Sequence, residues 1–191
     1  MQQKIQELIQ SSLLIKTQLL QSDELLQTIQ KVVEVLVAAF QNGNHVYFCG
    51  NGGSAADAQH LAAEFSGRFY KNRKALPAEA LHCNTSYLTA VANDFSFDVI
   101  YSRMIDGLGK KGDVLIGLST SGNSPNIVQA LETAQKKGLT TIGLTGVTGG
   151  EMKAFSNYLL NVPATDTPRI QECHMLIGHI ICQMVEEIIF M

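Results

Sequence analysis

The feature that most constrains the fold begins at residue 45, where the chain repeats a short apolar run, a turn rich in Gly or Ser, and an amphipathic stretch. This alternation is typical of a parallel α/β sheet with helices on its faces. Five apolar runs have the length of buried strands: 45–49, 77–81, 113–118, 140–144 and 158–162. Five other stretches have helical periodicity: 54–68, 85–93, 97–109, 125–137 and 170–190. We therefore expect one five-stranded parallel sheet flanked by helices.

The first 42 residues carry apolar side chains at helical spacing and no strand pattern. The segment Gln21-Ser22-Asp23 offers an N-cap for a second helix, and Asn42-Gly43-Asn44 predicts where that helix ends. Two extra helices should therefore precede the sheet. Because they carry many apolar and few charged residues, we expect part of their surface to pack on another subunit. With no linker, repeat or low-complexity segment, residues 1–191 are predicted to form a single domain.

Composition excludes several classes of protein. The 191 residues are 46% hydrophobic, enough to bury a proper core, so the chain is neither disordered nor fibrous. Fourteen Lys and Arg against 17 Asp and Glu give a net charge of −3, so no nucleic-acid partner is expected. No stretch approaches the roughly 18 uninterrupted apolar residues of a membrane span, so no membrane partner is expected either. Four cysteines without a C-x-x-C pair indicate free thiols in the cytoplasm: Cys49, Cys83, Cys173 and Cys182.

A phosphate site is predicted in the loop after the third strand, Ser119 to Pro125. Ser124 stands where an N-cap is expected, and Pro125 where a helix begins. Hydroxyls and backbone N–H groups at the positive end of a helix suit a sugar phosphate. The loop has no lysine, which argues against a nucleotide-hydrolysing P-loop. The alternative is a loop whose serines serve only turn formation.

A second loop, Gly50 to Ser54, follows the first strand and begins the helix that carries His60 and Glu64. Its glycines would let a ligand approach the backbone closely. The pattern does not match G-x-G-x-x-G, so a dinucleotide-binding fold is disfavoured. In open parallel sheets ligands bind beyond the C-terminal ends of the strands. Both loops therefore belong to the expected binding crevice.

Four residues could surround a divalent metal. His60 and Glu64 are spaced i, i+4, which places both on one face of a helix. Gln171 and His179 lie about two turns apart on the last predicted helix, close enough in phase to share a broad face. Nitrogen and oxygen ligands of this kind suit zinc. The alternatives are a surface hydrogen bond between His60 and Glu64 and a hydrogen-bonded core histidine at 179.

These segments carry a resemblance to a known family: 49–54, 60–68, 92–94, 119–124, 144–146 and 169–179. They resemble the phosphoheptose isomerases of the sugar isomerase (SIS) domain superfamily, and the resemblance covers essentially the whole chain. It implies a flavodoxin-like parallel sheet in a homotetramer with active sites between subunits. It also implies conversion of sedoheptulose 7-phosphate to D-glycero-D-manno-heptose 7-phosphate, the first step of ADP-heptose formation for the lipopolysaccharide core.

The resemblance assigns roles residue by residue. The implied ligands of one zinc per subunit are His60, Glu64, Gln171 and His179. The implied phosphate contacts are Ser119, Thr120, Ser121 and Ser124. Other implied substrate contacts are Asn51, Gly52, Gly53, Ser54, Asn93 and Asp94, together with Glu64 and Gln171. Because the reaction moves a proton between adjacent carbons through an enediol, it needs a base and an acid, for which Glu64 and His179 are expected.

One position departs from the family, and two other functions compete. Members often carry an acidic residue where this chain has Pro168, so a sugar-hydroxyl contact from that side would have to come from elsewhere, such as Asp166. The main alternative is a non-catalytic adaptor, because the initiator-associating protein that binds DnaA shares the superfamily. An adaptor has no chemical use for the set His60, Glu64 and His179. A sugar-phosphate-sensing regulator would normally bring a DNA-binding domain, for which 191 residues leave no length.

Overall fold

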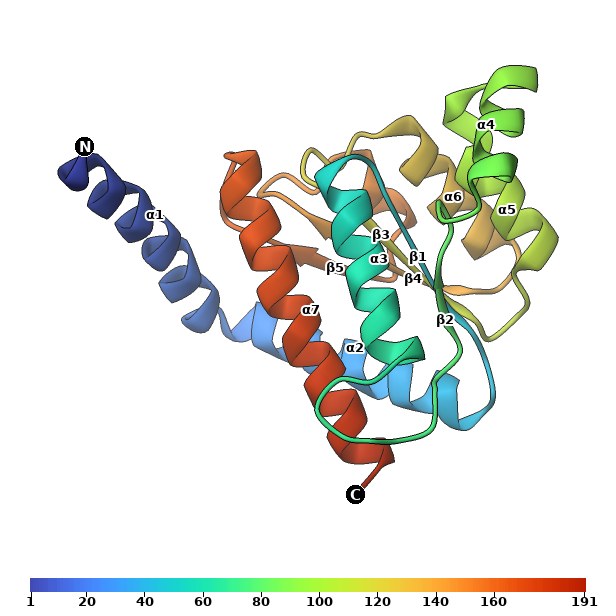
Figure 1. Cartoon of the computed structure of the whole chain (residues 1–191), viewed down its shortest axis with the longest axis horizontal. Coiled ribbons are helices and arrows are strands. Elements are labelled where there is room, and N and C mark those ends of the chain that lie inside the picture. The colour runs from blue at the N-terminus through green and yellow to red at the C-terminus, as the bar shows by residue number, and fades with distance from the viewer.

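Five strands pair in parallel in the order β2-β1-β3-β4-β5, which is the flavodoxin-like order. The computed structural model describes all residues, 1–191 (Figure 1). The strands are β1 (Val46–Gly50), β2 (Ala78–Ala80), β3 (Val114–Ser119), β4 (Thr140–Thr145) and β5 (Tyr158–Asn161). Each overlaps a predicted run, so the expected sheet is confirmed.

The helices are α1 (Gln2–Leu20), α2 (Asp23–Gln41), α3 (Gly53–Ser66), α4 (Thr85–Asp94), α5 (Ile100–Leu108), α6 (Pro125–Lys136) and α7 (Thr167–Ile189), with short 3-10 helices η1 (Phe97–Val99) and η2 (Glu151–Phe155). Alternating residues of β1 divide them into two layers. Val46 and Phe48 join one core with α2, α3 and α7. Tyr47 and Cys49 join a second core with α4, α5 and α6. The sheet is therefore covered on both faces (Figure 1).

Helix ends follow the predicted local chemistry, with a few differences. The Ser22 side chain accepts the N–H of Leu25 at the start of α2, as expected of an N-cap. Helix α7 begins at Thr167 instead of 170, because Pro168 lies in the first turn, where its missing N–H costs nothing. The predicted helix 97–109 is divided into η1 and α5, and η2 was not predicted.

The two N-terminal helices differ in how they use their apolar side chains. Helix α2 buries seven residues against the sheet and α7, whereas α1 buries Leu19 alone. Helix α1 extends away from the body of the molecule (Figure 1). Its exposed apolar side chains are Ile5, Leu8, Ile9, Leu13, Leu14 and Leu20. The free apolar surface expected of both helices therefore belongs mainly to α1.

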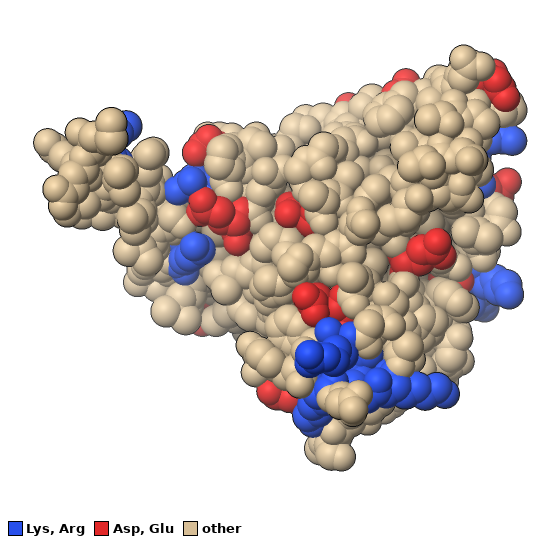
Figure 2. Space-filling model, in the orientation of Figure 1, with Lys and Arg blue, Asp and Glu red and all other residues tan.

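The surface carries charges of both signs, with basic side chains gathered near the C-terminus on the face shown in Figure 2. None of the helices is both long and apolar enough to cross a membrane. The four cysteines are free thiols, and Cys83 is the exposed one.

Candidate active site

The glycine loop after β1 and the serine loop after β3 lie next to each other at the C-terminal edge of the sheet, because β1 and β3 are paired neighbours. The chain leaves this point toward β2 on one side and toward β4 on the other, and such a switch point is where open α/β sheets bind ligands. A cavity of about 280 Å³ lies there. Its lining comes from both loops and the start of α7: Asn51, Gly53, Ser54, Leu118, Ser119, Thr120, Ser121, Ser124, Thr167 and Gln171.

Hydroxyl groups of the serine loop converge on one another inside this cavity. The Ser124 Oγ lies 2.9 Å from the Ser119 Oγ, which in turn lies 3.4 Å from the Ser121 Oγ. Ser124 occupies the N-cap position of α6, as predicted, but its side chain accepts no backbone N–H. The expectation that this hydroxyl caps the helix is therefore wrong. The backbone N–H groups of Ile127 and Val128 both donate to the Ser124 carbonyl, and Pro125 has none, so the Asn126 N–H and the loop hydroxyls are the groups that can meet an anion here.

A reciprocal amide pair ties the two loops together. Each of Asn51 and Asn126 donates its side-chain N–H to the other's Oδ1, and both distances are 2.9 Å. Asn126 is buried in the first turn of α6, and sequence reasoning missed it because the pairing joins positions 75 residues apart. Tyr101 adds a second tie by donating its hydroxyl hydrogen to the carbonyl of Gly50 at 2.5 Å. The predicted substrate residue Asn51 thus also fixes the glycine loop against the serine loop.

His60, Glu64 and His179 form the second half of the site. The Nε2 atom of His60 lies 3.0 Å from the Glu64 Oε1 and 3.0 Å from the His179 Nε2. The three ligand atoms lie within 4.8 Å of one another, and the side chain of His60 is about half exposed (49%). A single proton on the His60 nitrogen can serve only one of its two close neighbours, whereas a divalent ion would satisfy all three. Two imidazole nitrogens and one carboxylate oxygen are also the protein ligands of a catalytic zinc site, so the residues fit zinc.

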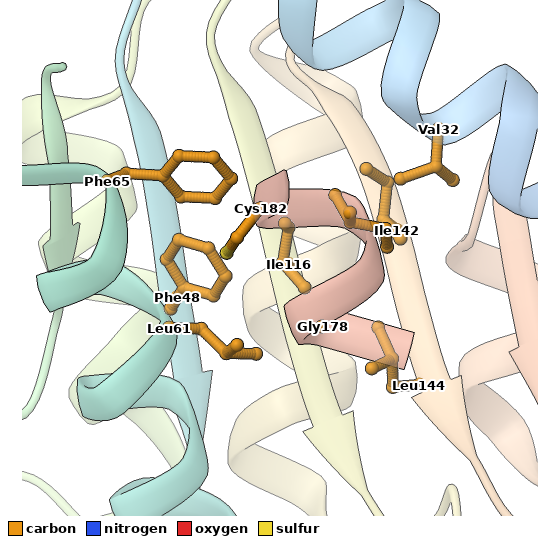
Figure 3. A pocket seen from close by; sticks show the side chains of 10 residues that line it. Val32, Phe48, Leu61, Phe65, Ile116, Ile142, Leu144, Gly178 and Cys182 are labelled. Carbon is orange, nitrogen blue, oxygen red and sulfur yellow. The ribbon is translucent and has the colours of Figure 1, made fainter. Parts of the chain in front are cut away.

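The two histidines meet because α3 and α7 approach closely beside them. A Cβ atom built on Gly178 would lie 2.5 Å from the Cδ2 of Leu61, so any larger residue here would displace either the Leu61 side chain or α7. Leu61 follows His60 in sequence and Gly178 precedes His179. Below the contact, apolar side chains surround a void of about 10 Å³ between the helices and the sheet (Figure 3).

The remaining predicted site residues fall into two groups. Gln171 lines the cavity, with its Nε2 3.5 Å from the Ser54 Oγ, and no hydrogen bond joins it to the histidines or Glu64. Its side chain also packs against Gly53, where a Cβ would lie 2.5 Å from that nitrogen. Asn93 and Asp94 are exposed at the end of α4, where the Asn93 amide donates to the Asp94 carboxylate, and they do not line the cavity.

The start of α7 explains the departure at Pro168. Arg169 forms an ion pair with Glu172 at 2.6 Å and approaches Asp166 at 3.9 Å, and it also donates to the Leu8 carbonyl of α1. The side chain of Asp166 is 68% exposed, so it remains open to solvent beside the cavity. Pro168 itself contributes only the first helical turn.

His174 lies fully buried on α7, three residues after Gln171. Its Nε2 lies 3.2 Å from the Thr145 carbonyl, and burial lowers the pKa of His174 to about 4, although the bond to Thr145 acts in the opposite direction. A neutral imidazole here packs α7 against β4.

Comparison with known proteins agrees with this geometry. A family model described as the SIS domain matches residues 14–146. The phosphoheptose isomerase of Aneurinibacillus thermoaerophilus is 51% identical over 182 residues, which are 95% of this chain and 92% of that protein. The phosphoheptose isomerase of Clostridium acetobutylicum is 50% identical over 186 residues, covering 97% of this chain and 95% of its own.

Solved structures give the same result. The phosphoheptose isomerase of Neisseria gonorrhoeae superposes with a TM-score of 0.91 at 39% identity, covering 97% of this chain and 98% of its own. That of Francisella tularensis superposes with a TM-score of 0.92 at 34% identity, covering 97% of each chain. The chain therefore belongs to the SIS domain family and, within it, to the phosphoheptose isomerases.

Proposed function

We propose that the protein is an aldose–ketose isomerase that converts sedoheptulose 7-phosphate to D-glycero-D-manno-heptose 7-phosphate. The observation that carries the proposal is that the hydroxyl-lined cavity at the N-terminus of α6 also borders the first turns of α3 and α7, the two helices that carry His60, Glu64 and His179. The first half suits the phosphate, and the second half suits proton transfer between adjacent carbons. The identity of about 50% to named isomerases supports the same activity.

The spacing of the two halves supports a long sugar phosphate. His60 lies six residues after Ser54 on α3, or about 9 Å along the helix, and His179 lies about 12 Å along α7 from Gln171. Ser54 and Gln171 line the phosphate cavity, whereas the histidines lie well beyond it. A seven-carbon sugar bound by its 7-phosphate has its reacting carbons, C1 and C2, at the far end of the molecule. The cluster is where those carbons would lie.

The proposed chemistry gives Glu64 and His179 two tasks each, proton transfer and metal binding, and gives the serine loop the phosphate. Glu64 removes the proton from carbon, and His179 exchanges a proton with the carbonyl oxygen, so that the reaction passes through an enediol. The serine loop residues Ser119, Thr120, Ser121 and Ser124 bind the phosphate and fix the register of the sugar. His60, Glu64 and His179 would hold one zinc ion. To supply a fourth ligand, the Gln171 amide would have to leave Ser54 and turn along α7 toward the cluster, because it is bonded to neither histidine nor Glu64. When bound, the ion would polarise the substrate's carbonyl oxygen.

The exposure of the cluster supports an assembled enzyme. The side chains of His60 and Glu64 are 49% and 23% exposed in the single chain, so another subunit is needed to exclude water from the reacting carbons. The uncovered apolar face of α1 supplies a surface for association, and Asn93 and Asp94 could serve a neighbouring subunit's site. We infer a cytoplasmic homotetramer that acts at the first step of ADP-heptose and lipopolysaccharide core synthesis.

The direct test is to incubate the purified protein with sedoheptulose 7-phosphate and to detect an aldoheptose phosphate. A strong chelator should abolish turnover, zinc should restore it, and His179→Ala should purify with little metal. The fold should remain without metal, because a chain of this size has sufficient core. Absence of turnover with zinc supplied would overturn the proposal in favour of the DnaA-associated type of adaptor. Turnover indifferent to chelation would remove zinc from it.

A further inference from the structure

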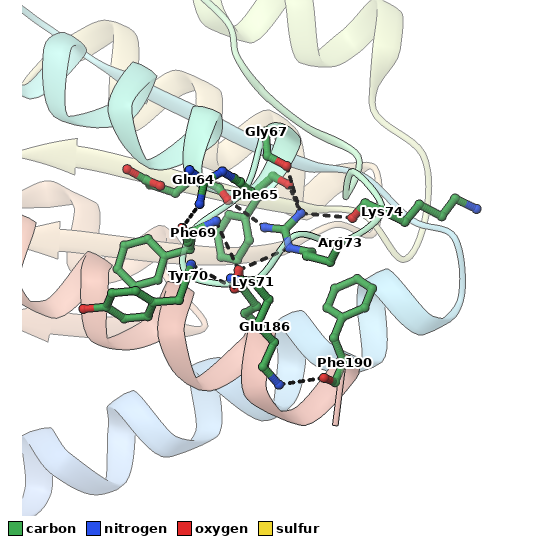
Figure 4. A network of polar contacts seen from close by, with 11 residues as sticks. Glu64, Phe65, Gly67, Phe69, Tyr70, Lys71, Arg73, Lys74, Glu186 and Phe190 are labelled. Carbon is green, nitrogen blue, oxygen red and sulfur yellow. Dashed lines mark hydrogen bonds and ion pairs between the residues drawn. The ribbon is translucent and has the colours of Figure 1, made fainter.

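A buried ion pair joins Arg73, in the loop that leaves α3, to Glu186 on α7. The carboxylate of Glu186 on α7 accepts the backbone N–H groups of Phe69, Tyr70 and Lys71 at 3.1, 3.0 and 2.6 Å. The Nε of Arg73 reaches the same carboxylate at 3.3 Å, and both side chains are only 3% exposed. Figure 4 shows how the loop wraps around this carboxylate.

The two terminal nitrogens of the Arg73 guanidinium cap the C-terminal end of α3. Its Nη2 donates to the carbonyl of Glu64 at 2.7 Å, and its Nη1 donates to the carbonyl of Phe65 at 2.7 Å and more weakly to that of Gly67 at 3.3 Å. These are carbonyls that the last turn of a helix leaves without partners. A planar, five-donor guanidinium can bind them and a carboxylate at the same time, whereas an ammonium cannot.

The buried pair of Arg73 and Glu186 is not explained by its contribution to folding stability alone. Apolar side chains of similar size often replace a buried ion pair without loss, because both charges must be taken out of water. Burial by itself would raise the pKa of Glu186, but the N–H groups of Lys71 and Phe69 and the Arg73 guanidinium outweigh it and hold that pKa below its ordinary value. The carboxylate is therefore a fixed, fully bonded anchor. Unlike an apolar contact, an ion pair with directional hydrogen bonds fixes the relative position of the segments that it joins.

The hydrogen bonds of this ion pair reach both helices that carry the cluster of His60, Glu64 and His179. On α3, Arg73 binds the backbone carbonyl of Glu64, the residue whose side chain meets His60. On α7, Glu186 lies seven residues, about two turns, after His179. Phe69, whose N–H binds Glu186, also packs its ring 5.7 Å from the His179 ring. One network thus sets the position of Glu64 on α3 relative to His179 on α7.

We propose that Arg73 is a positioning residue of the metal centre: by joining Glu186 on α7 to the end of α3, it holds Glu64 and His179 at the separation that a zinc ion requires. This inference rests on the proposed function for its catalytic meaning. Its physical content concerns metal binding by the chain itself and can be measured without substrate.

The test variant is Arg73→Lys, which keeps a cation beside Glu186 but cannot also bind the carbonyls of α3. Metal-free protein is titrated with Zn²⁺ against a chromophoric chelator, and with Co²⁺ alone to follow the absorption of the bound ion. We expect zinc affinity to fall about 10- to 100-fold, as is typical when groups supporting metal ligands are lost. The Co²⁺ spectrum should change as well.

The matched control is Asp113→Asn. Asp113 is also a buried carboxylate, 3% exposed, and accepts the N–H groups of His45 and Lys110 at 2.9 Å each, but it precedes β3 and its partners belong to neither α3, α7 nor the loop that carries Arg73. It should lower the melting temperature and leave zinc affinity and the Co²⁺ spectrum unchanged. Unchanged zinc affinity in Arg73→Lys, or an equal loss in Asp113→Asn, would overturn the proposal.

Two further outcomes are decisive. If Arg73→Lys does not fold, the same titration is made on Glu186→Gln, which keeps the arginine, and failure of both variants to fold would overturn the positioning role. With active wild-type enzyme, Arg73→Lys should lower kcat at saturating zinc and leave the KM for the sugar phosphate nearly unchanged, because the phosphate cavity is not altered. If wild-type enzyme shows no turnover, the proposed function fails, and the zinc titrations still judge the role of Arg73.

Discussion

The contact between Gly178 and Leu61 makes a quantitative prediction for Gly178→Ala. The added Cβ would lie 2.5 Å and 2.6 Å from the two δ-carbons of Leu61 and 3.1 Å from its Cγ. Carbon atoms prefer separations of about 3.5–4.0 Å, so either Leu61 or α7 must move by about 1 Å. The void beneath them measures only about 10 Å³ and cannot take the displaced side chain. We therefore expect α7 to shift away from α3.

Two energies of opposite sign determine the change in stability. Alanine gains about 0.5–1 kcal/mol over glycine inside a helix, while overpacking a core costs about 1–3 kcal/mol. The net loss is about 0–2.5 kcal/mol, and each kcal/mol corresponds to about 2–4 °C in a domain of this size. The effect on metal binding should be larger than the effect on stability. Ligand distances in a metal site tolerate about ±0.2 Å, and the 3.0 Å between His60 and His179 depends on this contact.

The assay compares thermal unfolding with zinc affinity for wild type, Gly178→Ala and Gly107→Ala. Gly107 is the matched control, because it lies in α5 and a Cβ there meets nothing within 4 Å. We expect Gly178→Ala to lose at least tenfold in zinc affinity with a modest change in melting temperature, and Gly107→Ala to keep wild-type affinity. A Gly178→Ala protein with wild-type zinc affinity would refute the argument that this close approach sets the ligand spacing.

Further substitutions test the other assignments. Glu64→Gln should lower turnover about 10²–10⁴-fold while sugar phosphate still binds, and near-normal turnover would exclude Glu64 as the base. Ser124→Ala should raise KM with little change in melting temperature, because its hydroxyl faces Ser119 and does not cap α6; a stability loss without a KM change would support the turn-only role. Because the pKa of buried His174 is about 4 against an ordinary 6.5, the unfolded chain binds a proton between these values that the folded chain does not. Acidification across this range should therefore lower the free energy of unfolding by about 3 kcal/mol in the wild type and by less in His174→Gln. Denaturant titrations at several pH values measure this, and the same pH dependence in both proteins would contradict the prediction.

Sequence periodicity was enough to predict a five-stranded parallel sheet flanked by helices, because strand and helix patterns are both visible in short windows of sequence. The flavodoxin-like arrangement was implied by the family resemblance. The apolar runs of the five strands and the amphipathic stretches between them alternate along the chain, and the crossover rules for parallel sheets leave few ways to arrange them. The errors occur where local patterns are weak. The last helix was predicted from residue 170, whereas α7 begins at Thr167 with Pro168 in its first turn, and η2 has too few residues for periodicity to show.

The site was predictable only in part. Loop chemistry at Ser119–Ser124 and the i, i+4 pair His60 and Glu64 are visible in short windows of sequence. The amide pair of Asn51 with Asn126 and the ion pair of Arg73 with Glu186 join positions 75 and 113 residues apart. Nothing in the local sequence of either partner distinguishes such residues from ordinary polar ones, and only the packing of the helices brings them together.

In the proposed function, the distance between the phosphate and the reacting carbons depends on three elements: the serine loop after β3, which binds the phosphate, and helices α3 and α7, which carry His60, Glu64 and His179. Helices α3 and α7 both begin at the phosphate cavity, where Ser54 and Gln171 lie, and both carry the metal-ligand cluster further along their length. A helix has a fixed rise per residue, so the distance from the start of α3 and α7 to the cluster is set by residue number. The contact of Gly178 with Leu61 and the proposed role of Arg73 with Glu186 then fix the position of α3 relative to α7. In the proposed reaction, selectivity for sugar length would therefore come from the serine loop and these two rigid helices together.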